Sequence, residues 1–261
     1  MQSVITSADN PQFKLARKLA QSGRERRKTG LTLLDGLHLI EAWQGSGRRL
    51  QKILLNAAVL DHRELKAWQA AHPAVPMVVF APGLYAELAG EDFPSGVLAL
   101  VDAPAAAGAI DPACDTVVID GIQDPGNLGT VLRSAAAAGF GQAVLSSQCA
   151  QVWGPKTLRS GMGAHFALQI HEAVDLPEFL DGFAGTVAVT DLAGAVPLYD
   201  ADLSPPIAWV FGSEGEGVSA AVLARATLRI KIPMPGRVES LNVSAAAAVC
   251  LFETLRQRRS A

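Results

Sequence analysis

The sequence predicts an α/β protein in which a domain with a parallel sheet follows a smaller α/β domain. After residue 113 the apolar segments are mostly continuous runs, which is typical of strands buried on both faces of a parallel sheet. Helix-like segments fall between these runs, as the crossovers between parallel strands require. A stretch rich in Pro, Ala and Gly, without periodicity, separates this part from the first hundred residues.

The first part alternates short strands with helices. Apolar segments predict strands at 31–34, 52–55, 77–80 and 97–101. Helical patterns predict helices at 37–44 and 61–71, and a basic helix between residues 14 and 28 precedes them. We therefore expect a small α/β domain at residues 1–104, followed by a linker at residues 105–113.

The second part, residues 114–261, continues the alternation. Apolar runs predict strands at 116–120, 143–147, 186–190, 207–211 and 228–232. Helices are expected at 128–138, 176–183, 219–224 and 241–258. Strands that alternate with helices in this way form a parallel sheet covered by helices on both faces.

Composition and cysteine usage predict a folded, soluble protein of a reducing compartment. Of the 261 residues, 49% are hydrophobic and 18% are charged, and no apolar run approaches the length of a membrane span. The start lacks the layout of a signal peptide. Cys114, Cys149 and Cys250 are too scattered for a disulfide framework or a metal site, so we expect three buried thiols, no metal and a cytoplasmic location.

Positive charge is concentrated at the beginning of the chain. Residues 1–52 hold ten Lys and Arg against four Asp and Glu, although the net charge of the whole chain is −3. Such a run is either a solvated helix face or a surface for a polyanion such as RNA. The candidate RNA-binding residues are Lys14, Arg17, Lys18, Arg24, Arg26, Arg27 and Lys28.

Three polar loops follow predicted strands, at the sheet edge where open parallel sheets bind ligands. They read DGIQDPGNLGTVLRSAAAAGF (120–140), VFGSEGEGVS (210–219) and IPMPGRVESLNVSAAAAVCLFE (232–253). In the first loop Asn127 is placed to cap the following helix, and Arg133 lies further along it. In the third, Ser240 and Asn242 are expected in the first turn of the last helix, where they can act as caps or contact a ligand.

Other familiar sites are absent from the sequence. The second loop has two carboxylates and no following Lys, which excludes a phosphate-binding P-loop. The segment GMGAHF imitates a dinucleotide fingerprint, but Phe166 stands where a small residue is needed. The glycine-rich loop of a Rossmann methyltransferase or an NAD-dependent enzyme is missing after the first strand.

In order and spacing, DPGNLGTVLRSA, FGSEGEGVS and IPMPGRVESLNVSAAAA resemble the three motifs of the SpoU (TrmH-like) family of RNA ribose 2′-O-methyltransferases, part of the SPOUT superfamily. The resemblance covers about residues 114–258. SADNPQFKLARKLA and LLDGLHLIEAW resemble the substrate-binding domain often joined to this family, a ribosomal-protein-L30e-like α/β module. The resemblance implies a deep trefoil knot, a homodimer with a shared active site, and S-adenosylmethionine as cofactor.

The motif residues carry over one by one. Asn127 and Arg133 match the Asn and Arg of the first motif, Glu214 the Glu of the second, and Ser240 and Asn242 the Ser and Asn of the third. The resemblance implies that these five form the catalytic site. The cofactor-binding residues that it implies are Thr190, Asp191, Leu192, Phe211, Gly212, Ser213, Gly215, Ile232, Met234, Ser240, Leu241 and Asn242.

The resemblance implies that Arg133 assists departure of the 2′-hydroxyl proton. Because an Arg side chain stays charged in proteins, we favour a role in fixing a phosphate and stabilising the developing alkoxide over a role as base. The expected substrate is ribosomal RNA, with transfer RNA as the alternative. A non-catalytic RNA-binding ribosome-assembly factor is a further alternative, although all five matched polar residues are present.

Overall fold

The computed structural model describes residues 3–89, 93–104, 108–191 and 196–260. The chain divides into two compact units, one of residues 1–105 together with 153–159, the other of residues 106–152 and 160–261. The segment 153–159 groups with the first unit although it lies far along the chain. Two expected features fall partly outside the described residues: the linker at 105–107, and Leu192 of the predicted cofactor site.

The first unit contains a mixed five-stranded sheet in the order β1-β4-β3-β5-β2. Its strands are β1 (Val4–Ile5), β2 (Leu31–Asp35), β3 (Lys52–Asn56), β4 (Met77–Phe80) and β5 (Val97–Asp102). β4 pairs in parallel with β1 and β3, whereas β5 pairs antiparallel with β2 and β3. The four expected strands are present. β1 escaped prediction because two residues are too short for a pattern.

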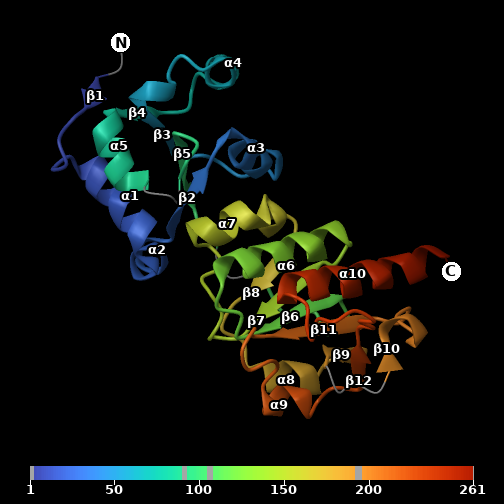
Figure 1. Ribbon diagram of the computed structural model, residues 1–261. Helices are drawn as coiled ribbons and strands as arrows, with labels where there is room; N and C mark the ends of the chain where they lie inside the picture. Colours follow the sequence, from blue (N-terminus) through green and yellow to red (C-terminus); the bar gives the residue numbers. More distant parts are fainter. Residues whose placement is uncertain (1–2, 90–92, 105–107, 192–195, 261) are drawn as a thin grey trace. The chain divides into compact units, whose positions relative to one another are not determined.

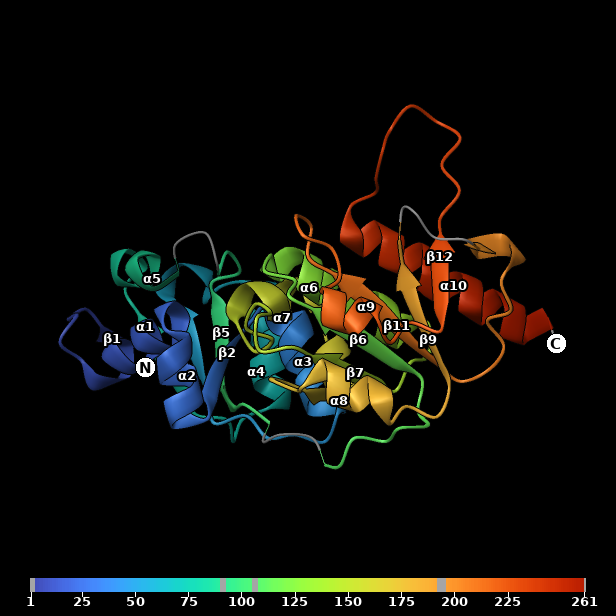
Figure 2. The same cartoon turned by 90° about the horizontal axis from the view of Figure 1, so that it is seen from below.

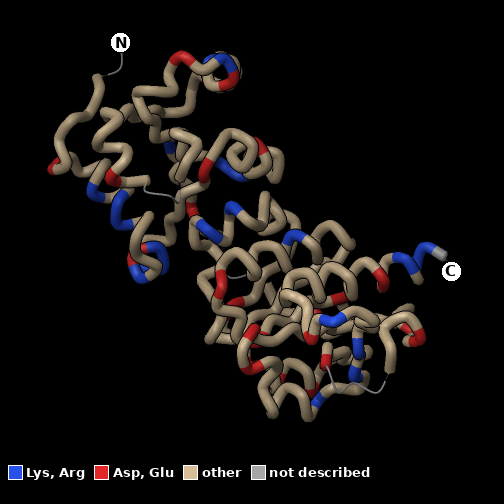
Figure 3. Tube along the Cα trace, viewed as in Figure 1, with Lys and Arg blue, Asp and Glu red and all other residues tan. Residues whose placement is uncertain are grey.

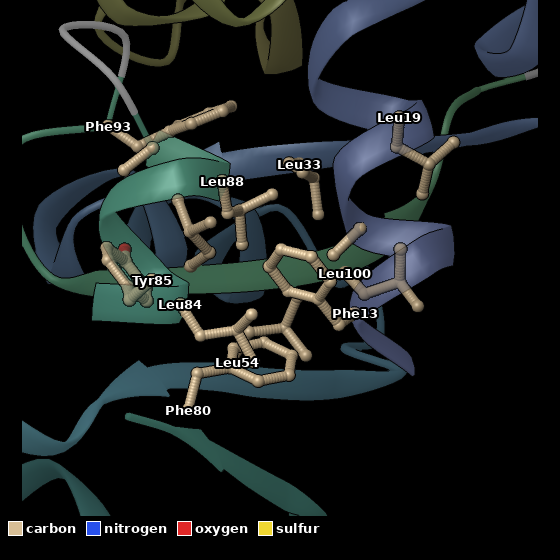
Figure 4. Packing of buried hydrophobic residues seen from close by; sticks show 13 residues of the cluster. Phe13, Leu19, Leu33, Leu54, Phe80, Leu84, Tyr85, Leu88, Phe93 and Leu100 are labelled. Carbon is tan, nitrogen blue, oxygen red and sulfur yellow. The ribbon is translucent and has the colours of Figure 1, made fainter. Parts of the chain in front are cut away.

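Five helices and one 3-10 turn surround this sheet. They are α1 (Pro11–Gln21), α2 (Gly23–Thr29), α3 (Leu37–Gly45), η1 (Ala57–Val59), α4 (Arg63–Ala71) and α5 (Pro82–Ala89). The core of the first unit lies between α1, α5 and the sheet, where Phe13 meets Phe80 edge to face at a centroid distance of 5.7 Å (Figure 4). Leu19, Leu88 and Leu100 fill the rest of this layer.

The expected single basic helix is wrong, because the chain breaks at Ser22 into α1 and α2. Ser22 ends α1 with its backbone N–H on the Lys18 carbonyl, and its hydroxyl accepts the Glu25 N–H at 3.2 Å to begin α2. A serine that caps a new helix in this way competes with continuation of the old one.

The second unit is built on a seven-stranded sheet in the order β10-β12-β9-β11-β6-β7-β8, and every pairing is parallel. The strands are β6 (Thr116–Asp120), β7 (Gln142–Leu145), β8 (Gln169–His171), β9 (Thr186–Thr190), β10 (Val196–Pro197), β11 (Ile207–Gly212) and β12 (Leu228–Lys231). The predicted parallel sheet is confirmed. The short edge strands β8 and β10 were not expected.

Helices cover both faces of this sheet (Figure 1). They are α6 (Pro125–Ala137), α8 (Leu176–Asp181), α9 (Ala220–Leu223) and α10 (Val243–Ser260), with 3-10 turns η2 (Ala164–Phe166) and η3 (Leu198–Asp200). α6 and α10 pack together on one face, where the Trp209 indole N–H donates to Thr254 Oγ1 at 2.9 Å. α8 and α9 lie on the other face, and α7 (Pro155–Gly161) begins in the segment that groups with the first unit.

No helix among the described residues is both long enough and apolar enough to cross a membrane. The three cysteines are free, but only Cys250 is fully buried, so the expectation of three buried thiols is wrong for Cys114 and Cys149, which are partly exposed. Burial raises the pKa of the Cys149 and Cys250 thiols. Both thiols therefore stay protonated at neutral pH and are poor nucleophiles.

Candidate active site

A pocket of about 430 Å³ opens where β9, β11 and β12 end. Its far wall is the segment between β12 and α10, residues 232–242, which reaches out beyond the sheet before returning to α10 (Figure 2). The three strand ends lie together because parallel neighbours finish at the same edge of a sheet. The lining residues are Thr190, Asp191, Gly212, Ser213, Glu214, Gly217, Val218, Ile230, Ile232, Met234, Ser240, Leu241, Asn242, Val243 and Ala246.

Most of the predicted cofactor residues line this pocket, and two of those that the structure describes do not. Phe211 is fully buried and stacks on Trp209 at a centroid distance of 6.0 Å, so its side chain belongs to the core. Gly215 lies on the outer side of the turn that Ser213 and Gly217 close with two backbone hydrogen bonds of 3.0 Å. Among the residues that the sequence did not indicate, Ile230 could have been found from register, since it pairs with Thr190.

Three motif side chains form a hydrogen-bonded chain at the edge of the pocket. Asn242 Nδ2 donates to Asn127 Oδ1 at 3.1 Å, and Asn127 Nδ2 donates to Glu214 Oε1 at 2.5 Å. These residues come from loops up to 115 residues apart in the sequence. The chain therefore holds α6, the glycine-rich turn and the start of α10 in one arrangement, with each amide oriented by its partner.

The caps of the two helices at this site differ from the expectation. Asp124, not Asn127, caps α6, with its carboxylate accepting the Asn127 N–H at 2.7 Å. Asn242 does cap α10, since its Oδ1 accepts the Ser244 N–H at 2.9 Å. However, α10 begins at Val243, so Ser240 lies on the loop before the helix rather than in its first turn. The side chain of Asn127 is therefore available for its hydrogen bonds with Glu214 and Asn242.

An ion pair shapes the opposite wall of the pocket. Arg229 of β12 donates to the Asp191 carboxylate through Nε at 2.8 Å and also through Nη2. The Asp191 side chain is only 19% exposed, so a fixed partner offsets part of the cost of burying its charge. Asp191 is thereby held as an oriented acceptor next to the pocket.

Arg133 does not line the pocket. It lies six residues beyond Asn127 on α6, which places it roughly 9 Å further along the helix axis. Its side chain is exposed, and among the described residues it has no hydrogen-bond or ion-pair partner. The guanidinium is therefore free to meet a ligand or another chain.

The predicted RNA-binding residues lie along α1 and α2, where basic residues gather (Figure 3). Arg26 is half-buried and donates to the Leu19 and Ala20 carbonyls at 2.5 and 3.2 Å, so it fastens α2 to the end of α1. Lys14 pairs with Asp9 at 2.8 Å. The exposed cations that remain are Arg17, Lys18, Arg24, Arg27 and Lys28.

Both units of the chain match known protein families. A model described as the SpoU rRNA Methylase family matches residues 115–252, and one described as the MRM3-like substrate binding domain matches residues 10–99. The chain is 32% identical to the 23S rRNA (guanosine(2553)-2′-O)-methyltransferase RlmP of Bacillus subtilis, over 95% of this chain and 97% of that protein.

Two further relatives come from Streptomyces viridochromogenes. The chain is 30% identical to a 23S rRNA (uridine(2479)-2′-O)-methyltransferase, over 98% of this chain and 93% of that protein. The crystal structure of the SpoU methyltransferase AviRb in complex with AdoMet aligns with a TM-score of 0.85 at 27% identity, covering 96% of this chain and 99% of that one.

Proposed function

The chain belongs to the SpoU rRNA methylase family, and from this premise we propose that it transfers a methyl group from S-adenosylmethionine to a ribose 2′-hydroxyl of 23S ribosomal RNA. The observation that carries the proposal is the hydrogen-bonded chain from Asn242 through Asn127 to Glu214 at the edge of the pocket. It joins side chains from all three family motifs at one place.

The pocket suits S-adenosylmethionine in size and chemistry. Its volume of about 430 Å³ lies within the usual range of small-molecule sites, roughly 300–1,000 Å³. Ile230, Ile232 and Leu241 offer an apolar wall for an adenine ring, and Asp191 offers an acceptor for ribose hydroxyls. Gly212 has no side chain, which lets the backbone of Gly217 and Val218 return close to the end of β11 and close the turn that walls the pocket. When bound, the cofactor supplies an electrophilic methyl group.

The residues of the chain supply alignment and charge. A ribose 2′-hydroxyl is a weak acid, so its attack needs close positioning and stabilisation of the negative charge that develops on oxygen. Arg133 provides a permanent positive charge for that oxygen or for a neighbouring phosphate, and the proton leaves to phosphate or water. Asn127, Ser240 and Asn242 order the ribose, and Glu214 holds Asn127 in place through its hydrogen bond.

The first unit binds the RNA substrate. Its exposed cations on α1 and α2 suit contacts with phosphates, which contribute affinity and orientation, while folded RNA is read at its loops and bulges. The match to a substrate-binding domain over residues 10–99 supports this assignment. Arg26 serves the fold of this surface rather than the RNA, because its donors are engaged by carbonyls of α1.

We further propose a homodimer, a trefoil knot around the cofactor site and action in the cytoplasm. Two features of the second unit support the dimer: Phe252 on α10 is 46% exposed, and Arg133 on the adjacent α6 does not line its own pocket. In a dimer built on these helices, Arg133 would serve the pocket of the partner subunit. The last helix follows directly on the loop that walls the pocket, which is where the knot of this family encloses its cofactor.

The proposal is tested by methyl transfer and cofactor binding. Purified protein with S-adenosylmethionine is expected to methylate 23S rRNA isolated from a strain that lacks the gene, and to leave rRNA from the parent strain unmodified because its site is already occupied. Calorimetric titration is expected to show binding of S-adenosylmethionine. Cofactor binding without methyl transfer to rRNA or tRNA would contradict the enzymatic role and favour a ribosome-assembly factor.

Replacing Asn127 with Asp is expected to lower kcat/KM for methyl transfer by about tenfold or more. The substitution removes the donor that faces Glu214 at 2.5 Å and places a second carboxylate there, so like charges repel where a hydrogen bond of roughly 1–2 kcal/mol stood. A carboxylate in the first turn of α6 interacts favourably with the helix N-terminus, which offsets part of this cost, so the melting temperature should fall only slightly. Asn127→Ala, which adds no charge, should lose less activity; an equal or greater loss would contradict the repulsion.

A further inference from the structure

A second pocket, of about 280 Å³, lies on the other side of the glycine-rich turn from the first. The two pockets share Ser213, Glu214 and Gly217, so a single turn of the chain forms the wall between them. The second pocket is lined by Asp120, Gly121, Gln123, Gln148, Ser213, Glu214, Gly215, Glu216, Gly217 and Ser219. Of these lining residues, only Ser213, Glu214 and Gly215 belong to the predicted site.

The lining chemistry excludes phosphate as the occupant. Asp120, Glu214 and Glu216 contribute carboxylates, and neither Lys nor Arg lines the pocket, so a phosphate would meet only like charge. The remaining polar side chains are the amides of Gln123 and Gln148 and the hydroxyls of Ser213 and Ser219, each able to donate and to accept. An uncharged ligand that presents several hydrogen-bond donors fits this set.

Three of the polar side chains that face this ligand are available to bind it. Among the described residues, the side chains of Gln123, Gln148 and Glu216 have no hydrogen-bond partner within the chain. By contrast Asp120, which is buried, already accepts the Ser219 N–H at 2.8 Å and fixes the end of the turn. Gly121 has a positive φ of 74°, and a side chain there would come within 3.6 Å of Gln148 Oε1, so the amide lies close over the backbone at this position.

We propose that this second pocket holds the nucleobase of the target nucleotide, and that the base is guanine; this rests on the proposed function. Guanine is the one standard base whose pairing edge carries two adjacent donors, N1–H and the 2-amino group, which a carboxylate accepts together. Glu216 supplies that carboxylate, and the amides of Gln123 and Gln148 supply donors for the O6 and N7 acceptors. Enzymes that act on one nucleotide of an RNA read it in this way when it is unstacked.

The position of the pocket fits a base whose ribose is being methylated. The wall shared with the first pocket contains Glu214, which holds Asn127 of the catalytic set. A base in the second pocket therefore leaves its ribose at this wall, next to the site of the methyl donor. Family membership does not decide the base, because the relatives named above include one guanosine and one uridine methyltransferase.

The first test identifies the modified base. Wild-type enzyme methylates 23S rRNA from a strain that lacks the gene, and the RNA is digested to nucleosides and analysed by mass spectrometry. We expect 2′-O-methylguanosine. A methylated adenosine, cytidine or uridine would overturn the inference and leave the proposed function standing, whereas no methyl transfer at all would overturn both.

The second test asks whether Glu216 recognises the 2-amino group of guanine. In an RNA fragment that contains the target, replacing guanosine by inosine removes the 2-amino group and should lower kcat/KM of the wild type by about 10- to 100-fold. In Glu216→Gln this discrimination should shrink to within about threefold, because the amide cannot accept both donors. Glu178→Gln changes an exposed carboxylate on α8 that lines neither pocket, so it is the matched control and should discriminate as the wild type does.

Cofactor affinity separates this role from a second cofactor subsite. S-adenosylmethionine should bind Glu216→Gln within about threefold of the wild-type affinity in calorimetric titration. Because Glu216 is exposed at the tip of the turn, the variant should also keep the wild-type melting temperature. A tenfold loss of cofactor affinity, or unchanged discrimination against inosine, would overturn the assignment.

Discussion

Replacing Arg133 with Ala is expected to lower kcat for methyl transfer by at least about 100-fold at saturating RNA and cofactor, because the developing alkoxide loses its positive partner. The melting temperature should stay unchanged, since Arg133 is exposed and has no partner among the described residues. Single-turnover transfer of a labelled methyl group to 23S rRNA measures the effect. A normal kcat with a raised KM for RNA would instead make Arg133 a binding residue.

Two control variants test the role of Arg133. Arg63→Ala removes another exposed arginine, from α4, and should leave kcat unchanged. Arg133→Lys keeps the charge but loses the planar fork, so partial recovery relative to Ala supports electrostatic stabilisation. Recovery that depends on pH near the ordinary pKa of a lysine, about 10.4, would instead indicate proton abstraction.

Mixed subunits test whether Arg133 serves the partner's pocket. A heterodimer of Arg133→Ala and Asn242→Ala chains would have one site with both lesions and one site with neither. Each variant homodimer carries one lesion in every site, so activity should rise above that of either variant when the two proteins are refolded together, to a fraction of the wild-type level. Absence of any recovery, with heterodimers shown by mass spectrometry, would place each Arg133 in the site of its own chain.

The sequence pattern predicted the strands that carry the site, because long buried runs in a parallel sheet need no tertiary information. The helices of the first unit show where prediction from the sequence pattern fails. Residues 14–28 read as one basic stretch, and the break at Ser22 depends on a cap and on Arg26 reaching back to the Leu19 carbonyl. Contacts of this kind between neighbouring helices leave no periodic signal.

The candidate site, too, was predictable only in part. Motif order placed Asn127, Glu214 and Asn242 together, but neither the hydrogen bonds between them nor the capping of α6 by Asp124 could be predicted from spacing alone. Phe211 was assigned to the cofactor because the family resemblance implies contact along the backbone of residues 211–215, and its side chain lies in the core beside Trp209. Successive side chains of a strand point to opposite faces, so only one of two neighbouring residues can face a pocket. Whether Gly215 faces the pocket depends on the conformation of the turn that follows the strand.

Gly161 gives room to a buried neighbour. A side chain at this position would come within 2.5 Å of the His165 ring. His165 is fully buried and contacts the Val152 carbonyl through Nε2 at 2.9 Å, and burial lowers its pKa to about 4. The ring therefore stays neutral at physiological pH and occupies the space that a larger residue at 161 would need.

Replacing Gly212 with Ala is expected to abolish measurable binding of S-adenosylmethionine. Gly212 ends β11, and a side chain at this position would overlap the backbone of Gly217 and Val218 where the turn folds back. Backbone cannot rotate away as a side chain can, so the turn must shift, and with it Ser213, Glu214 and Gly217 of the pocket wall. Overpacking of this kind costs about 1–3 kcal/mol of folding stability.

The measurements are calorimetric titration with the cofactor and thermal unfolding, and Gly215→Ala is the matched control. Gly215 lies three residues away in the same turn, without a positive φ and with no atom within 4 Å of the added carbon. It should bind S-adenosylmethionine and unfold as the wild type does. Because the two substitutions add the same methyl group to one loop, equal effects would show that the loss does not arise from the contact at Gly212. Loss at Gly212 alone would assign the effect to the contact between the end of β11 and the returning chain.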